Sequence, residues 1–122
     1  MNFKYLVALL YDKYIIQEDT LMSINNPDLL YGLSIYLYNN GIISDNYCDV
    51  EKILQDLGLA INDDLVGLVD MYARLSETSD YLMVKGMVEH LMPKYPRLCL
   101  YILAKINRMF VLESKSRDAK VF

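Results

Sequence analysis

The chain has 122 residues, of which 54% are hydrophobic and 23% charged, enough to bury a core without disulfides or metals. This composition excludes a largely disordered chain, and five glycines and three prolines are too few for a turn-rich β-sandwich. The net charge is −4, but residues 1–92 carry 5 basic and 14 acidic side chains while residues 93–122 carry 7 and 2. Because an acidic body repels nucleic acid, we expect a basic protein partner and no nucleic acid.

Helical periodicity runs through the chain, and no strand is predicted. Residues 2–16 form the first expected helix, whose apolar positions recur every three or four residues: Phe3, Leu6, Val7, Leu10 and Tyr14. Residues 18–24 either extend this helix or kink it. Asn26 and Pro27 predict the next helix start, as N-cap and first helical residue, and Gly41 predicts its left-handed stop.

Three further helices are expected before the last one. The first opens at residues 44–45 and ends at Gly58, and the second begins after the cap Asn62. The third runs from the cap Ser79 to about residue 92, where two prolines bracket a tight corner.

The stretch from Pro96 to Leu112 is apolar almost all the way round, which is typical of a helix at the centre of a fold. Its expected core positions are Leu100, Leu103, Ile106 and Phe110. We therefore predict an all-α protein, a compact single-domain bundle of about six helices around this apolar C-terminal helix. The domain would span residues 1–113, and residues 114–122 would form a polar, frayed tail.

The N-terminus and the hydropathy predict a cytoplasmic protein. One lysine, a short apolar run from Leu6 to Leu10 and no small-residue cleavage site do not make a signal peptide. No charge-free run approaches the roughly 20 residues of a membrane helix, so no membrane association is expected. The oligomeric state stays open.

Few residues suggest catalysis. The single histidine, His90, follows Glu89 directly, and neighbouring helical positions point about 100° apart, so this carboxylate cannot orient the imidazole. No glycine-rich phosphate loop, metal-spaced His/Cys set or G-x-S-x-G turn is present. Cys48 and Cys99 fall in helical patterns and are expected to be buried free thiols, with a disulfide as the alternative. We predict no enzyme, no cofactor and no metal.

An acidic cluster is the strongest predicted surface feature. Residues 45–64 contain a single cation, Lys52, and the following candidate binding residues: Asp45, Tyr47, Asp49, Glu51, Asp56, Asp63 and Asp64. Spacing places Asp45, Asp49 and Asp56 on one stripe of the expected helix. Asp63 and Asp64 fall in the first turn of the next helix, where negative charge interacts favourably with the helix dipole. Two interpretations stay open: a solvated face with ordinary capping, or a docking surface for a basic partner with the tyrosine as an aromatic anchor.

Tyrosine is in excess, with eleven residues and no tryptophan, and four gather in one span: Tyr31, Tyr36, Tyr38 and Tyr47. Tyrosine suits wet interfaces, but the codon usage of an A/T-rich genome explains the high number of tyrosines equally well. If the acidic residues are only solvated, the tyrosines of the 27–40 helix are the next candidate interface. The methionines indicate either adaptable core packing or the lining of a groove: Met71, Met83, Met87, Met92 and Met109.

This acidic, tyrosine-rich, all-helical profile without an active site resembles the immunity proteins that bacteria pair with secreted nuclease toxins, as in contact-dependent growth inhibition. The acidic cluster and Tyr47 carry the resemblance, which is one of overall character without a shared motif. It implies a non-enzymatic inhibitor whose acidic face covers the basic cleft of a toxin. A second resemblance is to viral Bcl-2-like proteins, whose buried helix usually lies mid-chain, whereas here it is last. It implies the alternative function, an adaptor or chaperone-like module that binds a partner helix in a Met/Tyr-lined groove.

Overall fold

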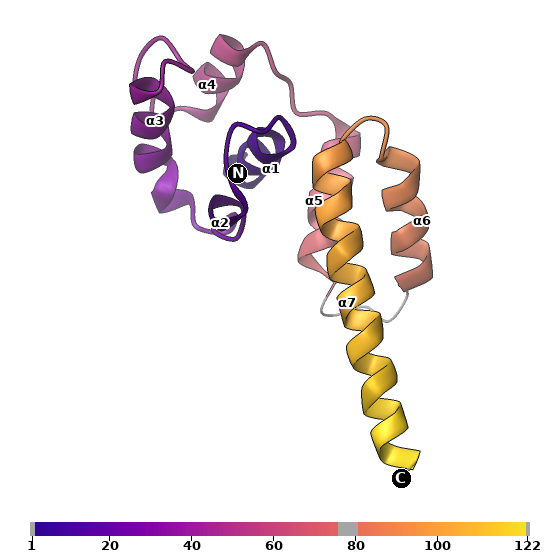
Figure 1. Ribbon diagram of the computed structural model, residues 1–122. Coiled ribbons are helices and arrows are strands. Elements are labelled where there is room, and N and C mark those ends of the chain that lie inside the picture. The colour runs from indigo at the N-terminus through magenta and orange to yellow at the C-terminus, as the bar shows by residue number, and fades with distance from the viewer. Residues whose placement is uncertain (1, 76–80, 122) are drawn as a thin grey trace. The chain divides into compact units, whose positions relative to one another are not determined.

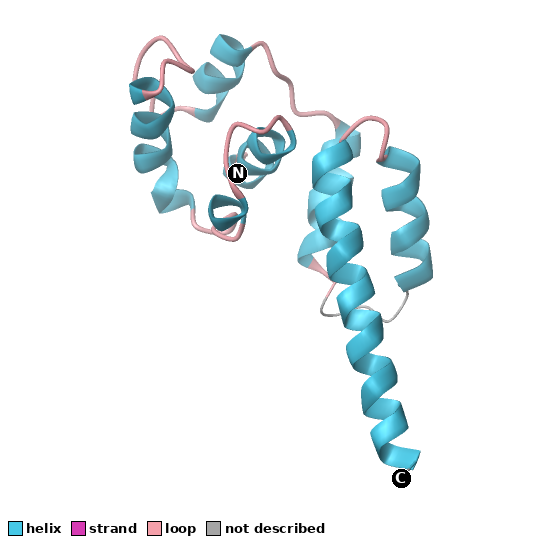
Figure 2. Ribbon diagram, in the orientation of Figure 1, coloured by secondary structure: helices cyan, strands magenta, loops and turns pink. Residues whose placement is uncertain are grey.

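A computed structural model describes residues 2–75 and 81–121, with the backbone alone described for residue 81 and for residues 110–121. Within these residues every regular element is a helix, which confirms the predicted all-α class (Figure 2). The chain divides into two compact units, Met1–Val69 and Asp70–Phe122, called the first and the second unit below. The expectation of one domain over residues 1–113 stays a prediction.

The first unit is built around its first helix. Its elements are α1 (Phe3–Asp12), α2 (Glu18–Leu21), the 3₁₀ turn η1 (Pro27–Leu29), α3 (Leu30–Asn39) and α4 (Val50–Leu57), and α5 (Asp63–Ala73) leads into the second unit (Figure 1). α1 packs against α2 and α4. Its residues 6–12 are all buried, including Asp12. A helix enclosed on nearly all sides is a core helix, so α1 forms the core of the first unit.

The end of α1 differs from the prediction. The helix stops at Asp12 rather than near residue 16, because Tyr14 adopts a left-handed backbone conformation with φ of 63°. The backbone N–H of Ile15 donates to the C=O of Leu10 at 2.9 Å, which caps the helix end as in a Schellman motif. Tyr14 is 73% exposed and does not belong to the apolar face, whereas Ile16 is buried.

The boundaries of α3 follow the predicted signals in part. Pro27 occupies the first position, but of the 3₁₀ turn η1, and Asn26 makes no side-chain capping hydrogen bond. Gly41 has φ of 70°, as predicted for a left-handed stop. The N–H of Ile42 donates to the C=O of Leu37 at 2.9 Å, so the helix ends with the same pattern as α1.

Ser34 gives a stability prediction within α3. It is wholly buried, and its hydroxyl has no hydrogen-bond partner among the described residues. Because an unsatisfied buried polar group costs about 1–3 kcal/mol, Ser34→Ala should raise the free energy of unfolding by about 1 kcal/mol. Thermal denaturation should show a melting temperature about 3–5 °C higher. The control is Ser44→Ala, which removes a hydrogen-bonded hydroxyl and should lower it. An unchanged or lower melting temperature for Ser34→Ala would contradict the prediction.

The second unit contains the end of α5, α6 (Tyr81–Leu91) and α7 (Pro96–Val121), and α6 packs against α7 (Figure 1). Pro96 begins α7, as predicted. The predicted end at Leu112 is wrong, because the helix continues to Val121 and includes the polar residues from 114 onward. The predicted cap Ser79 lies outside the described residues.

Within residues 96–109 of α7, the part whose side chains are described, burial is confined to one face. Its buried residues are spaced mainly by four: Leu98, Cys99, Ile102 and Ile106. Among the predicted core positions, Ile106 is confirmed, Leu103 is half-buried and Leu100 is 58% exposed. The side chain of Phe110 lies outside the described residues. The prediction that Leu100 is a core residue is wrong, because apolar composition does not tell which faces of a helix find a neighbour.

Candidate functional site

The acidic cluster lies in the loop before α4, on α4 and in the first turn of α5. All six carboxylates are exposed, and Tyr47 is half-buried. The predicted stripe through Asp45, Asp49 and Asp56 is wrong, because α4 begins at Val50 and residues 44–49 form a loop. The carboxylates of the cluster are therefore exposed, but they do not lie on one face of a single helix.

Two of these carboxylates hold the loop and the helix start. Asp49 is the N-cap of α4, and its Oδ1 accepts from the N–H of Glu51 at 2.9 Å. Asp56 Oδ2 accepts from the backbone N–H of Ser44 at 2.6 Å and from its hydroxyl at 3.0 Å. Since that hydroxyl donates to Asp56, it accepts from the Tyr47 hydroxyl 3.1 Å away. Asp56 and Tyr47 thus brace the loop against α4.

Two of the other carboxylates, Glu51 and Asp45, accept one hydrogen bond each. Glu51 Oε1 accepts from the side-chain amide of Asn2 at 3.0 Å. Asp45 Oδ1 accepts within the loop, from the N–H of Asn46 at 2.8 Å. The predicted cap of α5 is confirmed, because Asn62 Oδ1 accepts from the N–H of Leu65 at 3.1 Å. Asp63 stands exposed in the first turn of that helix. Asp45 and Asp63 can therefore be replaced without removing a cap or the loop brace.

The charge asymmetry of the chain follows the division into units. The first unit has 3 basic and 10 acidic side chains, a net charge of −7, and the second unit has 9 and 6, a net of +3. Between Lys13 and Lys52 the sequence contains no lysine, arginine or histidine. The first unit consequently carries an excess of negative charge.

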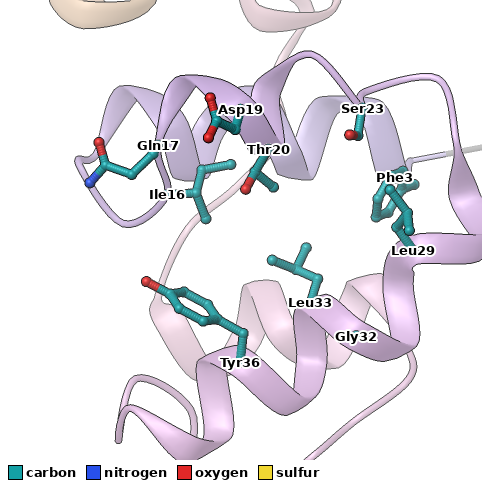
Figure 3. A pocket seen from close by; sticks show the side chains of 10 residues that line it. All are labelled: Phe3, Ile16, Gln17, Asp19, Thr20, Ser23, Leu29, Gly32, Leu33 and Tyr36. Atoms are coloured by element: carbon teal, nitrogen blue, oxygen red, sulfur yellow. The ribbon is translucent and has the colours of Figure 1, made fainter.

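An apolar pocket of about 490 Å³ opens on the first unit, between the α2 region and α3 (Figure 3). Ile16 and Thr20 form one wall, and Leu33 and Tyr36 face them from α3. Leu29 also lines it; its side chain is 42% exposed and that of Tyr36 is 46% exposed. The volume falls within the roughly 300–1,000 Å³ typical of ligand pockets.

The predicted tyrosine cluster does not form one surface. Of its members, only Tyr36 lines the pocket. Tyr31 and Tyr38 are exposed and, being seven residues apart, share a different stripe of α3, while Tyr47 braces the loop before α4. Sequence reasoning missed the pocket itself, although Gly32 in the middle of a helical pattern was a signal for it.

The methionines singled out in the sequence all belong to the second unit, and none of them lines the pocket. Met71, Met92 and Met109 are half-buried there, and Met83 and Met87 are exposed on α6. In the same unit Lys105 Nζ donates to the Tyr72 hydroxyl at 3.3 Å and lies 4.7 Å from that ring's centroid. Lys105 thus links α7 to α5 and is not simply a solvated charge.

The residues considered for catalysis are spread out. Cys99 is a buried free thiol, as predicted, but Cys48 is exposed in the loop before α4, so that part of the prediction was wrong. His90 is exposed on α6. In the described part of the chain, no group of three or more metal-ligating side chains could hold an ion. None of the described helices is both long enough and apolar enough to cross a membrane.

Fold and site together define a small all-helical protein with an acidic first unit that carries an apolar pocket. Comparisons with protein-family models, with curated proteins and with solved structures find no match for this chain. Its function is therefore inferred below from its own residues.

Proposed function

We propose that this protein is a non-enzymatic inhibitor that binds a basic protein through the carboxylates of its first unit. The observation that carries the proposal is the net charge of −7, with no cation between Lys13 and Lys52. Such a surface accelerates association with a basic partner and disfavours an acidic one. A nuclease-type toxin has this chemistry, because its nucleic-acid cleft is basic, and it is the partner that the resemblance to immunity proteins implies.

Capping and loop bracing account for only part of the acidic surface. Asp49 and Asp56 have such roles, but several other exposed carboxylates are neither a cap nor a brace: Glu18, Asp19, Asp28, Asp45 and Asp63. Concentrated like charges repel one another and destabilise the compact state. A basic partner would relieve this repulsion, which favours the docking interpretation over a merely solvated face.

The test compares single charge reversals in the two units. Asp45→Lys and Asp63→Lys reverse exposed carboxylates of the first unit, and Glu89→Lys on α6 is the matched control in the second. Immobilised wild-type protein should retain basic proteins from an extract of its source cells. The first two variants should slow association with the purified main partner by about tenfold at low salt, and by less in high salt. Glu89→Lys should bind like the wild type.

Inhibition is measured separately from binding. Adding the wild-type protein to the purified partner should block that partner's nuclease activity. Adding the Asp45→Lys variant instead should leave the nuclease activity in place. Retention of no protein, or of acidic proteins, would overturn the proposal, and so would equal binding by all variants. Binding without loss of nuclease activity would overturn the inhibitor role.

A further inference from the structure

We infer that the α2–α3 pocket receives one apolar side chain of a basic amphipathic helix of the partner, whose cations pair with carboxylates beside the pocket. This inference rests on the proposed function, because it names the element of the basic partner that the first unit binds. It places the apolar contact on α3 and not at the acidic cluster around α4.

The pocket is shaped for an apolar side chain. Ile16 and Leu33 are themselves buried and face each other across the open space, so they supply fixed apolar walls (Figure 3). Leu29 and Tyr36 remain more than 40% exposed on the α3 side and would lose that exposed area to an inserted side chain. Burial of the exposed apolar area of Leu29 and Tyr36 would favour binding.

Gly32 leaves the pocket open. It lies inside α3 and lines the pocket, and a Cβ atom built on it would meet no atom within 4 Å. Gly32 is not among the residues with positive φ, so its backbone does not require glycine. Glycine is the poorest helix former after proline, so this position sacrifices helix stability without a need from backbone or packing. Because Gly32 lines the pocket, a larger side chain here has room to grow and would narrow the pocket mouth.

The rim of the pocket selects a cationic partner. Asp19 lines the pocket, and its carboxylate points away from the open space, so a cation that pairs with it would lie outside the pocket (Figure 3). Glu18 and Asp28 adjoin lining residues in the chain, and both are exposed. Between Lys13 and Lys52 the sequence has no lysine or arginine that could compete for them. The pocket is lined by helices and turns, which offer no strand edge that a partner strand could extend. The partner is therefore recognised through side chains, as when a helix binds in a groove.

The experiment fills the pocket by a single substitution. Gly32→Leu should occupy the open space, and Gly86→Leu is the matched control, because Gly86 is also a helical glycine with nothing within 4 Å of a Cβ atom. The probe is a synthetic amphipathic helix with one phenylalanine flanked by lysines. Its Kd should rise at least about tenfold for Gly32→Leu and stay unchanged for Gly86→Leu. Thermal melting should show both variants folded, since leucine is a better helix former than glycine.

Two altered peptides and amide chemical shifts complete the test. Replacing the phenylalanine by alanine, or the lysines by glutamates, should weaken binding at least about tenfold. The wild-type peptide should shift the resonances of Ile16, Thr20, Leu33 and Tyr36. Unchanged binding by Gly32→Leu, or equal binding of the glutamate peptide, would overturn the inference. So would saturable binding of a neutral apolar dye together with no binding of the lysine peptide, which would assign the pocket to a small molecule.

The same variants separate this inference from the proposed function. In the extract experiment, loss of the partner with Asp45→Lys but not with Gly32→Leu would overturn the pocket inference and leave the proposed function standing. Loss with Gly32→Leu but not with the reversals at Asp45 and Asp63 would support the pocket and overturn the acidic cluster as the interface. Retention by every variant would overturn both.

Discussion

Leu10→Ala should lower the free energy of unfolding by about 3–5 kcal/mol, whereas the same truncation at Leu100 should change it by less than about 0.5 kcal/mol. Leu10 has no exposed surface and lies in α1, which is enclosed on nearly all sides. Its truncation therefore leaves a cavity that the surrounding side chains can fill only in part. Leu100 is 58% exposed on α7, and its truncation removes mostly solvated atoms.

Urea denaturation followed by far-ultraviolet circular dichroism measures both variants on one scale. The comparison is matched, because both substitutions remove the same atoms from a helix interior. A larger loss for Leu100→Ala than for Leu10→Ala would show that the last helix is central after all, as the composition of residues 96–112 had suggested.

Asp49→Ala combined with Asp56→Ala should lower the free energy of unfolding by about 2–3 kcal/mol. Loss of the N-cap at Asp49 costs about 1 kcal/mol. Asp56 accepts two hydrogen bonds from Ser44, and hydrogen bonds to a charged group contribute about 1.5–3 kcal/mol. Because Asp56 is exposed, the lower end of that range applies.

The control has the same chemistry and the same change in charge. Asp45→Ala combined with Asp63→Ala removes two exposed carboxylates, but no cap and no loop brace, and should cost less than about 1 kcal/mol. Equal losses in the two double variants, measured by denaturation, would contradict the bracing role of Asp56. The result also matters for binding studies, since a defect in the Asp49 and Asp56 variant would mix lost stability with lost contacts.

Local stereochemistry made several helix boundaries predictable. The stops at Gly41 and Gly58 and the starts at Asn62 and Pro96 are confirmed, because each depends on the conformation or hydrogen bonding of one residue and its near neighbours. The start of α4 was missed for a related reason. Residues 44–45 and Asp49 are all good capping residues, and Asp49 became the cap where the loop is braced from Asp56.

The candidate site was predictable only as a list of charges. Sequence reasoning named the exposed carboxylates of residues 45–64, because charged side chains are seldom buried, but it did not single out Glu18, Asp19 and Asp28. It could not name the pocket, since Ile16 and Leu33 face each other only after the chain turns between α2 and α3. Gly32 was visible as a weak helix residue, but its open surroundings became apparent only in three dimensions.

By itself the sequence determined the helical class, many of the helix ends and the acidic character of residues 1–69, all of which depend on residue type and short spacing. Tertiary structure alone decided how completely each helix is covered. The stretch from Pro96 to Leu112 is the more continuously apolar one, yet α1 is the more completely buried. Burial depends on how many neighbours cover a helix, and those neighbours are supplied by contacts between residues far apart in the chain.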